Sequence, residues 1–293
     1  MMKKITLFIS ILLLLTSCTS SQPEKLKISA TTWIGYTPLF YAKEKGWLKP
    51  LNIKLLHVVS LSENMYLYQS GNSDAYVGTQ YEYSIISPQD HKILPVMMFD
   101  RSYGGDIIMS NVSIETLQNT NKTIDAYLEM DSINSTLLRD FIKQHHLHEK
   151  NINYINQDQA KSSALSAEKA KNPTLIITYN PYNVDLEKRG FKEIASTRTG
   201  LDLLVVDALF TTEATLYKHK EQFVELKKLV DKAIDELQRN PREFYKTVKP
   251  YMLELSYKDF MHSLEDIIWI NKEISPELKD RLSKDNFPTR GLI

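Results

Sequence analysis

The sequence predicts an α/β fold that ends in a helical region. Short apolar segments alternate with helical segments up to about residue 207, a pattern typical of α/β proteins. The composition is that of an ordinary globular protein, with 42% hydrophobic and 25% charged residues. After residue 212 the apolar residues follow a helical period only, and four prolines interrupt the last 53 residues, 241–293.

The first part of the chain predicts four strands separated by helices. Thr37 is a favourable N-cap and Pro38 suits the first turn of a helix that is expected to stop near Gly46. A second helix, 63–70, is expected to end at Gly71. The strands are predicted at residues 27–31, 53–59, 74–78 and 93–99. This alternation predicts a mainly parallel sheet with right-handed crossovers.

The middle of the chain repeats the alternation, and the end departs from it. Strands are predicted at 106–109, 122–127, 152–155 and 174–178, and helices at 134–147 and 159–171. Residues 212–239 predict one long amphipathic helix, with Phe223, Leu226 and Val230 among its inward positions. Residues 241–293 are expected to be wholly helical.

The N-terminus predicts export and lipid attachment. A short cationic start, an apolar stretch of about ten residues and small residues before a cut site make a secretory signal, 1–17. The stretch is too short to span a bilayer, which takes roughly 20 residues. Leu15-Thr16-Ser17-Cys18 resembles the bacterial lipobox, and Cys18 is the only cysteine. We expect a lipid on Cys18, a tether over 18–25 and a place in the bacterial cell envelope, facing the periplasm or the exterior. A plain signal peptide with a chance cysteine is the alternative.

Charge and motifs disfavour several classes of function. The 36 basic and 36 acidic residues balance, which gives no electrostatic case for binding nucleic acid. The only histidine cluster, His145, His146 and His148, ends a predicted helix, where favourable dipole placement explains it, so no metal site and no cofactor are predicted. Because Gly-x-Ser-x-Gly, His-Glu-x-x-His and phosphate-binding glycine loops are missing, an enzyme is not expected, although spatial pairs of carboxylates stay open.

Polar and aromatic residues gather where the predicted strands end. Open α/β sheets bind ligands at the carboxyl ends of their strands, so these residues are candidates for ligand contact. Each one alone could equally be a cap or a turn residue. The candidates are Trp33, Tyr36, Thr79, Glu82, Ser102, Asp106, Asn134, Tyr179, Asn180 and Asp207.

Several motifs, in order, resemble one known family. They are Trp33-x-Gly-Tyr-x-Pro-Leu-x-Tyr-Ala-Lys-Glu-Lys-Gly46, Ser70-Gly-Asn-Ser-Asp74-Ala with Thr79 and Glu82, Asp100-Arg-Ser-Tyr-Gly-Gly-Asp106 and Tyr179-Asn-Pro-Tyr182. Together they resemble the solute-binding proteins of nitrate, sulfonate and taurine importers, a group that includes thiamine-precursor binders. Gly105 stands where this family usually has alanine, and Tyr179 where it often has tryptophan. The resemblance covers about residues 26–280.

This resemblance implies a type II periplasmic-binding fold with two α/β lobes. The first lobe would comprise 26–103 and 206–293, and the second 104–205. Two hinge strands, near 100–106 and 198–207, would let the lobes close on a solute. The implied partners are a small molecule and the permease and ATPase of an ABC importer, with the membrane reached through the lipid anchor and the protein itself a monomer.

The candidate residues favour a neutral or cationic nitrogen-containing solute. Trp33 and Tyr36 would form an aromatic floor, and Glu82, Asp106 and Asp207 bring three carboxylates. Sulfonate or nitrate sites call instead for arginine, lysine or helix N-termini with few acids. An oxyanion ligand and a role as receptor for a membrane signalling protein stay open. The pyrimidine-precursor synthases that share the fold are less similar, being cysteine-rich and intracellular.

Overall fold

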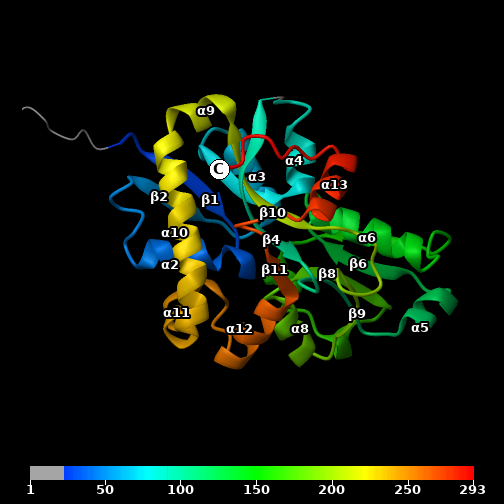
Figure 1. Cartoon of the computed structure of the whole chain (residues 1–293). Helices are drawn as coiled ribbons and strands as arrows, with labels where there is room; N and C mark the ends of the chain where they lie inside the picture. Colours follow the sequence, from blue (N-terminus) through cyan, green and yellow to red (C-terminus); the bar gives the residue numbers. More distant parts are fainter. Residues whose placement is uncertain (1–22, 91) are drawn as a thin grey trace, which may run out of the picture.

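The chain forms two β-sheets, each with helices packed against it (Figure 1). The computed structural model describes residues 23–90 and 92–293. The first sheet has six strands in the order β11-β4-β10-β3-β1-β2, and the second has five in the order β7-β6-β8-β5-β9. The chain leaves the first sheet after β4 and returns to it at β10. We call the first sheet with its helices the first lobe and the second sheet with its helices the second lobe.

The first lobe is built from both ends of the described chain. Its N-terminal elements are β1 (Leu26–Ala30), η1 (Ile34–Tyr36), α2 (Thr37–Glu44), β2 (Ile53–His57), α3 (Leu61–Gln69), β3 (Ala75–Thr79), α4 (Gln80–Ile86) and β4 (Ile93–Ser102). Its C-terminal elements are β10 (Val206–Thr212), α9 (Glu213–Lys218), α10 (Lys220–Arg239), α11 (Pro241–Val248), η3 (Lys249–Tyr251), α12 (Tyr257–Ser263), η4 (Leu264–Asp266), β11 (Ile267–Trp269) and α13 (Pro276–Lys284).

The second lobe is one continuous stretch between the two crossings. It contains β5 (Asp106–Ser110), α5 (Ile114–Asn119), β6 (Ile124–Leu128), α6 (Ile133–Gln144), β7 (Ile152–Asn156), α7 (Gln159–Ser162), η2 (Ala167–Lys169), β8 (Thr174–Tyr179), α8 (Asn183–Lys188) and β9 (Lys192–Ser196). The crossings are β4 to β5 and β9 to β10, and Ser102 N donates to Val205 O where they meet, 3.0 Å away. The exact boundaries predicted for the lobes stay a prediction.

Both sheets are mixed: the four strands predicted for the first part of the chain run in one direction, as expected, but β10 and β11 run opposite to them. β1 pairs parallel with β2 and β3, and β6 pairs parallel with β7 and β8. β10 is antiparallel to β3 and β4, and β5 is antiparallel to β8 and β9. The physical reason is the crossing between lobes: β5 and β10 enter each sheet from the other lobe rather than through a βαβ unit, so no right-handed crossover sets their direction.

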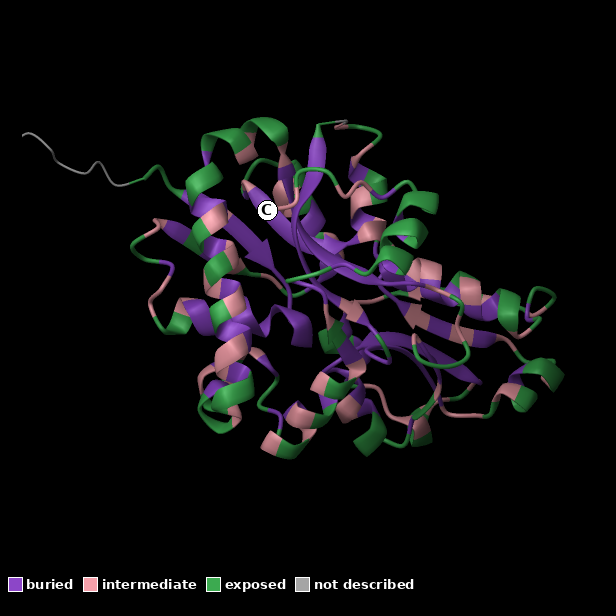
Figure 2. Ribbon diagram, in the orientation of Figure 1, coloured by how far each residue is buried: buried purple, intermediate pink, exposed green. Residues whose placement is uncertain are grey.

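The first sheet is buried on both faces (Figure 2). Successive side chains of a strand point to opposite faces. Tyr76 and Phe210 therefore pack in a cluster that includes Leu278 of α13, whereas Val77 and Leu209 pack with the apolar side of α10. The second sheet repeats this arrangement, with α6 against one face and α8 against the other. Each sheet is thus held rigidly and can place side chains at its edge.

Four local predictions were wrong. Thr37 is the first helical residue and its hydroxyl donates to Ile34 O, because Ile34–Tyr36 already form a 3₁₀ turn. Residues 159–171 hold only α7 and η2, since the Ser163 hydroxyl bonds back to the chain and Ser166 is extended. The predicted helix 212–239 divides at His219 into α9 and α10. Residues 241–293 include β11, whose Ile-Ile-Trp sequence suits a strand and pairs with β4.

The start of the described chain is attached to the first lobe. Glu24 forms an ion pair with Lys218, 2.7 Å between Oε1 and Nζ, and its carbonyl accepts from Gln222 Nε2 at 2.9 Å. The predicted signal, 1–17, and Cys18 lie outside the described residues. Among the helices that are described, none is both long and apolar enough to cross a membrane.

Candidate functional site

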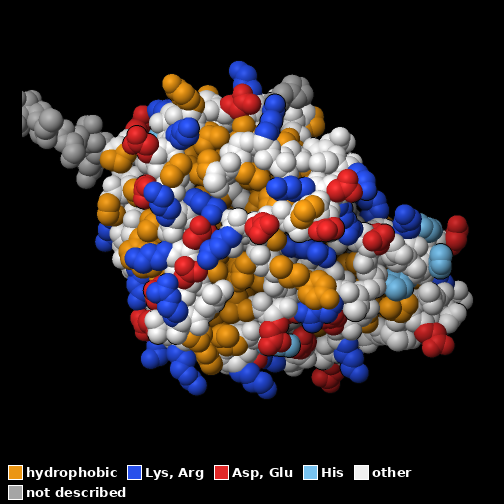
Figure 3. Space-filling model, in the orientation of Figure 1, with side chains coloured by type: hydrophobic (Ala, Val, Ile, Leu, Met, Phe, Trp, Pro, Cys, Tyr) orange, Lys and Arg blue, Asp and Glu red, His pale blue; other side chains and the backbone are white. Residues whose placement is uncertain are grey.

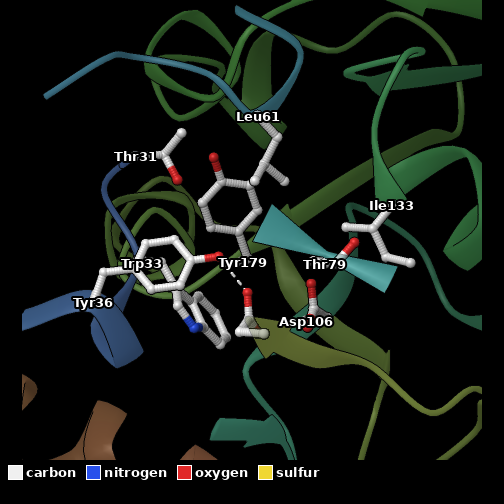
Figure 4. A pocket seen from close by; sticks show the side chains of 9 residues that line it. Thr31, Trp33, Tyr36, Leu61, Thr79, Asp106, Ile133 and Tyr179 are labelled. Carbon is white, nitrogen blue, oxygen red and sulfur yellow. Dashed lines mark hydrogen bonds between the residues drawn. The ribbon is translucent and has the colours of Figure 1, made fainter. Parts of the chain in front are cut away.

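A cavity lies between the two lobes (Figure 4). Thr79 ends β3 and Tyr179 ends β8, while Asp207 and Asp106 lie at the beginnings of β10 and β5. Because β10 and β5 run antiparallel to those neighbours, their beginnings lie at the same edge, with Asp207 paired to Thr79 and Asp106 to Tyr179. The lining residues are Thr31, Trp33, Tyr36, Leu61, Thr79, Asp106, Ile133, Tyr179 and Asp207.

The cavity is small and enclosed by buried side chains. Its volume is about 10 Å³. About one water molecule needs that much space. Trp33, Tyr36 and Tyr179 form aromatic walls, and the Trp33 and Tyr179 rings meet edge-on with centroids 6.0 Å apart, one from each lobe. The lobes are therefore closed on each other in this structure.

Hydrogen bonds fix most of the polar groups around the cavity. The Tyr36 hydroxyl donates to Asp207 Oδ1, and Trp33 Nε1 donates to Asp100 Oδ1 at 3.2 Å. Asp100 reaches this position past Gly35, where a Cβ atom would lie 1.9 Å from Asp100 Oδ2.

Two hydroxyl groups of the lining stay free for a ligand. Among the described residues, the buried hydroxyls of Thr31 and Tyr179 have no hydrogen-bond partner. Both residues line the cavity, Thr31 from the first lobe and Tyr179 from the second. Unpaired buried hydroxyls are costly, so a bound molecule that pairs with them gains affinity.

The lining is rich in carboxyl groups and poor in cations. Burial raises the pKa of Asp106 to about 7. Burial also raises the pKa values of Asp100 and Asp207 well above the ordinary range, and the proximity of Asp100 raises that of Asp207 further. No lysine or arginine is among the residues that line the cavity. A positive charge placed there would lower these pKa values and stabilise the carboxylates.

The structure brings six of the ten predicted ligand residues to the cavity and places four around it. Trp33, Tyr36, Thr79, Asp106, Tyr179 and Asp207 line it, whereas Glu82, Ser102, Asn134 and Asn180 do not. The side chains of those four are buried and form hydrogen bonds within the protein: Glu82 with Thr79, the Ser102 hydroxyl with Thr197, Asn134 with Gln159, and Asn180 with Asp266.

Sequence reasoning missed three lining residues and one neighbour. Thr31 directly follows β1, so the strand-end argument that selected Trp33 could have found it. Leu61 and Ile133 begin α3 and α6, and nothing in their apolar side chains points to a ligand site. Asp100 lies inside the predicted hinge segment but was not selected.

Charged groups close the rim of the cleft. Arg198, between β9 and β10, donates from Nη2 to Asp266 Oδ1 at 2.7 Å and from Nε to Tyr103 O at 3.1 Å. Asn180 Nδ2 of the second lobe donates to the other oxygen of Asp266, 2.9 Å away. Asp266 of the first lobe therefore joins the two lobes at the rim.

Within residues 23–90 and 92–293, no group of three or more His, Cys, Asp or Glu side chains could hold a metal ion. Lys and Arg side chains are interspersed with Asp and Glu over the face in Figure 3, with no single-sign field.

A family model and a motif match the sequence. The model described as "NMT1/THI5 like" matches residues 33–244, and a prokaryotic membrane lipoprotein lipid attachment site matches residues 2–19. None of the curated proteins compared with the chain matches it.

Solved structures share the fold at low sequence identity. The alkanesulfonate-binding protein SsuA from Xanthomonas axonopodis pv. citri, bound to MOPS, is 14% identical with a TM-score of 0.70, covering 91% of this chain and 92% of its own. The ligand-binding component of an ABC-type import system from Staphylococcus aureus, with zinc bound, is 17% identical with a TM-score of 0.67 and covers 89% and 91%. The periplasmic nitrate-binding protein NrtA from Synechocystis PCC 6803 is 14% identical with a TM-score of 0.61 and covers 82% and 70%.

These comparisons confirm the predicted family, fold and envelope localisation. The two lobes match the periplasmic binding fold, and the attachment motif ends one residue after Cys18. The chain belongs to the NMT1/THI5-like family and is a lipoprotein.

Proposed function

We propose that this lipoprotein captures a small nitrogen-containing solute with a positive charge and delivers it to the permease and ATPase of an ABC importer. One observation carries the proposal. Asp106 from the second lobe and Asp207 from the first face the same closed cavity, and no cation accompanies them. Burying negatively charged carboxylates without a counter-charge is costly, and a protonated nitrogen would supply that counter-charge.

The walls of the cavity suit the same ligand. Three aromatic side chains, Trp33, Tyr36 and Tyr179, surround the carboxyl groups. An organic cation gains from the face of an aromatic ring as well as from a carboxylate. A nitrate or sulfonate would meet Asp106 and Asp207 with no arginine or lysine in the lining, which disfavours an oxyanion.

The size of the cavity bears on how a solute enters. Sites for drug-sized molecules have volumes of about 300–1,000 Å³. The cavity of this closed form is about 10 Å³, far below that range, so the lobes must separate to admit even a small solute. Such a solute enters when the lobes separate and is enclosed when they close, and the closed form offers both lobes together to the permease. The proposal assigns the protein binding and delivery rather than catalysis.

A thermal-shift screen of the chain without residues 1–18 tests the proposal. The screen holds small amines, aminopyrimidines, amino acids, nitrate and sulfonates. A ligand at 100 times its dissociation constant adds about 2.7 kcal/mol to stability, which is a shift of several degrees. We expect a hit among the amines or aminopyrimidines and none with Asp207→Asn. A hit only among nitrate or sulfonates would overturn the predicted solute. A screen in which no compound raises the melting temperature would favour a sensory role.

A further inference from the structure

Two helices begin at the cavity, one in each lobe. α3 begins at Leu61 in the first lobe and α6 at Ile133 in the second, and both residues line the cavity. The first amide groups of a helix have no acceptor within it. Such amides commonly hold an anion, because the helix dipole adds to their positive charge.

Both amides are already bound, each by a carboxyl group of the opposite lobe. Leu61 N donates to Glu129 Oε2 at 3.2 Å, and Ile133 N donates to Glu82 Oε1 at 3.2 Å. Glu82 is 0% exposed and Glu129 is 2% exposed. The two contacts mirror one another, since each lobe supplies one helix and one carboxyl group.

The second oxygen of each carboxyl group binds within its own lobe. Glu82 Oε2 accepts from Thr79 N at 2.8 Å and from Thr79 Oγ1 at 2.6 Å. Glu129 Oε1 accepts from Gln159 N at 3.2 Å. Each carboxyl group therefore bridges the lobes with one oxygen on either side.

The helices do not need these carboxyl groups for their own capping. Ser60 caps α3 by accepting from Glu63 N at 3.1 Å, and Ser132 caps α6 by accepting from Asn134 N at 3.2 Å. The interlobe bonds come in addition and form only when the lobes meet. Helix capping alone does not explain them.

We propose that Glu82 and Glu129 occupy the place of an oxyanion at both helix N-termini, so that they hold the lobes closed and exclude oxyanionic solutes from the cleft. The proposal rests on the proposed closure of the lobes around a solute. It assigns these two residues a role in specificity without contact to the solute. The nitrogen-containing solute then meets Asp106 and Asp207, and the helix amides stay occupied.

Hydrogen exchange of single amides, measured by NMR on the lipoprotein in detergent, tests this. In Glu129→Ala the Leu61 amide should exchange at least about ten-fold faster, and in Glu82→Ala the Ile133 amide should do so, because a hydrogen bond to a buried carboxyl oxygen is lost. Formate, a small carboxylate, is the probe for the position that the removed carboxyl group leaves empty. It should slow the exchange of the same amide again, whereas chloride at equal concentration should not.

Glu63→Ala is the matched control. Glu63 of the same helix α3 accepts at Oε2 from Val59 N, the residue before the N-cap Ser60, so this bond lies wholly within the first lobe. In Glu63→Ala the exchange rate of the Ile133 amide should not change, and formate should not alter it. If an alanine variant does not fold, Glu129→Gln keeps the shape with a single acceptor oxygen, so either Leu61 or Gln159 should exchange faster.

The proposal would be overturned if the Leu61 and Ile133 amides exchanged at unchanged rates in the folded Glu129 and Glu82 variants. It would also be overturned if formate slowed exchange in these variants no more than it does in Glu63→Ala. Nitrate binding by the unmodified protein would overturn the exclusion of oxyanions. No amine is present in the exchange experiment. A failed amine screen would therefore refute the proposed solute and leave this inference standing.

Discussion

Replacing Asp106 by asparagine should make the empty protein more stable and its binding weaker. Burial raises the pKa of Asp106 from 3.8 to about 7. Because the pKa is higher in the folded protein than in the unfolded chain, the protonated Asp106 stabilises the folded state fully below pH 3.8. This contribution to the free energy of unfolding is lost as the pH rises through 7. The loss is complete at pH 8 and amounts to about 4 kcal/mol, at 1.36 kcal/mol per unit.

Asparagine keeps the shape and carries no charge at any pH. We therefore expect Asp106→Asn to match the unmodified protein near pH 4 and to exceed it increasingly up to pH 8, by about 4 kcal/mol at most, or roughly 8 °C in melting temperature. Amine affinity should fall about ten-fold to a hundred-fold with the loss of a charged hydrogen bond.

Thermal unfolding followed by circular dichroism from pH 4 to 9 measures the difference in stability. Asp285→Asn, a change at an exposed aspartate, is the control and should give a flat difference. A difference between Asp106→Asn and the unmodified protein that does not change with pH would refute the reasoning, as would a less stable variant at pH 8.

Three further changes test the walls and the rim. Trp33→Ala should cost roughly 1–3 kcal/mol of solute affinity in calorimetry, and unchanged affinity in a folded variant would make Trp33 a core residue only. Gly35→Ala should cost about 1–3 kcal/mol in urea unfolding, because its Cβ would lie 1.9 Å from Asp100 Oδ2; full stability would contradict that close approach. Arg198→Ala should cost no more than about 1 kcal/mol in the same assay, since its side chain is 40% exposed in the pair with Asp266; a loss of several kcal/mol would show a larger role.

Most strands could be predicted from the sequence, because their apolar runs are short and bounded by turn residues. β9 (Lys192–Ser196) was missed, since its burial is partial and Lys192 and Glu193 interrupt the apolar pattern. The direction of the strands that enter from the other lobe was beyond local patterns. β5 and β10 take their direction from the other lobe, and neither Asp106 nor Asp207 carries a local sign of that.

The rule that ligands bind at the ends of strands predicted part of the candidate site. It selected Trp33, Thr79 and Tyr179, which line the cavity. It also selected Glu82, whose carboxyl group instead binds Thr79 and the amide of Ile133. Whether a polar side chain at a strand end meets solute or another amide depends on contacts between distant segments, which one sequence does not contain.

The attachment of Glu24 to α9 and α10 has a consequence for how the protein works beside a membrane. With a lipid on Cys18, only residues 19–25 separate the bilayer from β1, and seven residues span at most about 25 Å. This tether joins the first lobe, where Glu24 is bound to α9 and α10. In the capture cycle proposed above, the first lobe would stay within that distance of the membrane, and opening of the cleft would move the second lobe relative to it.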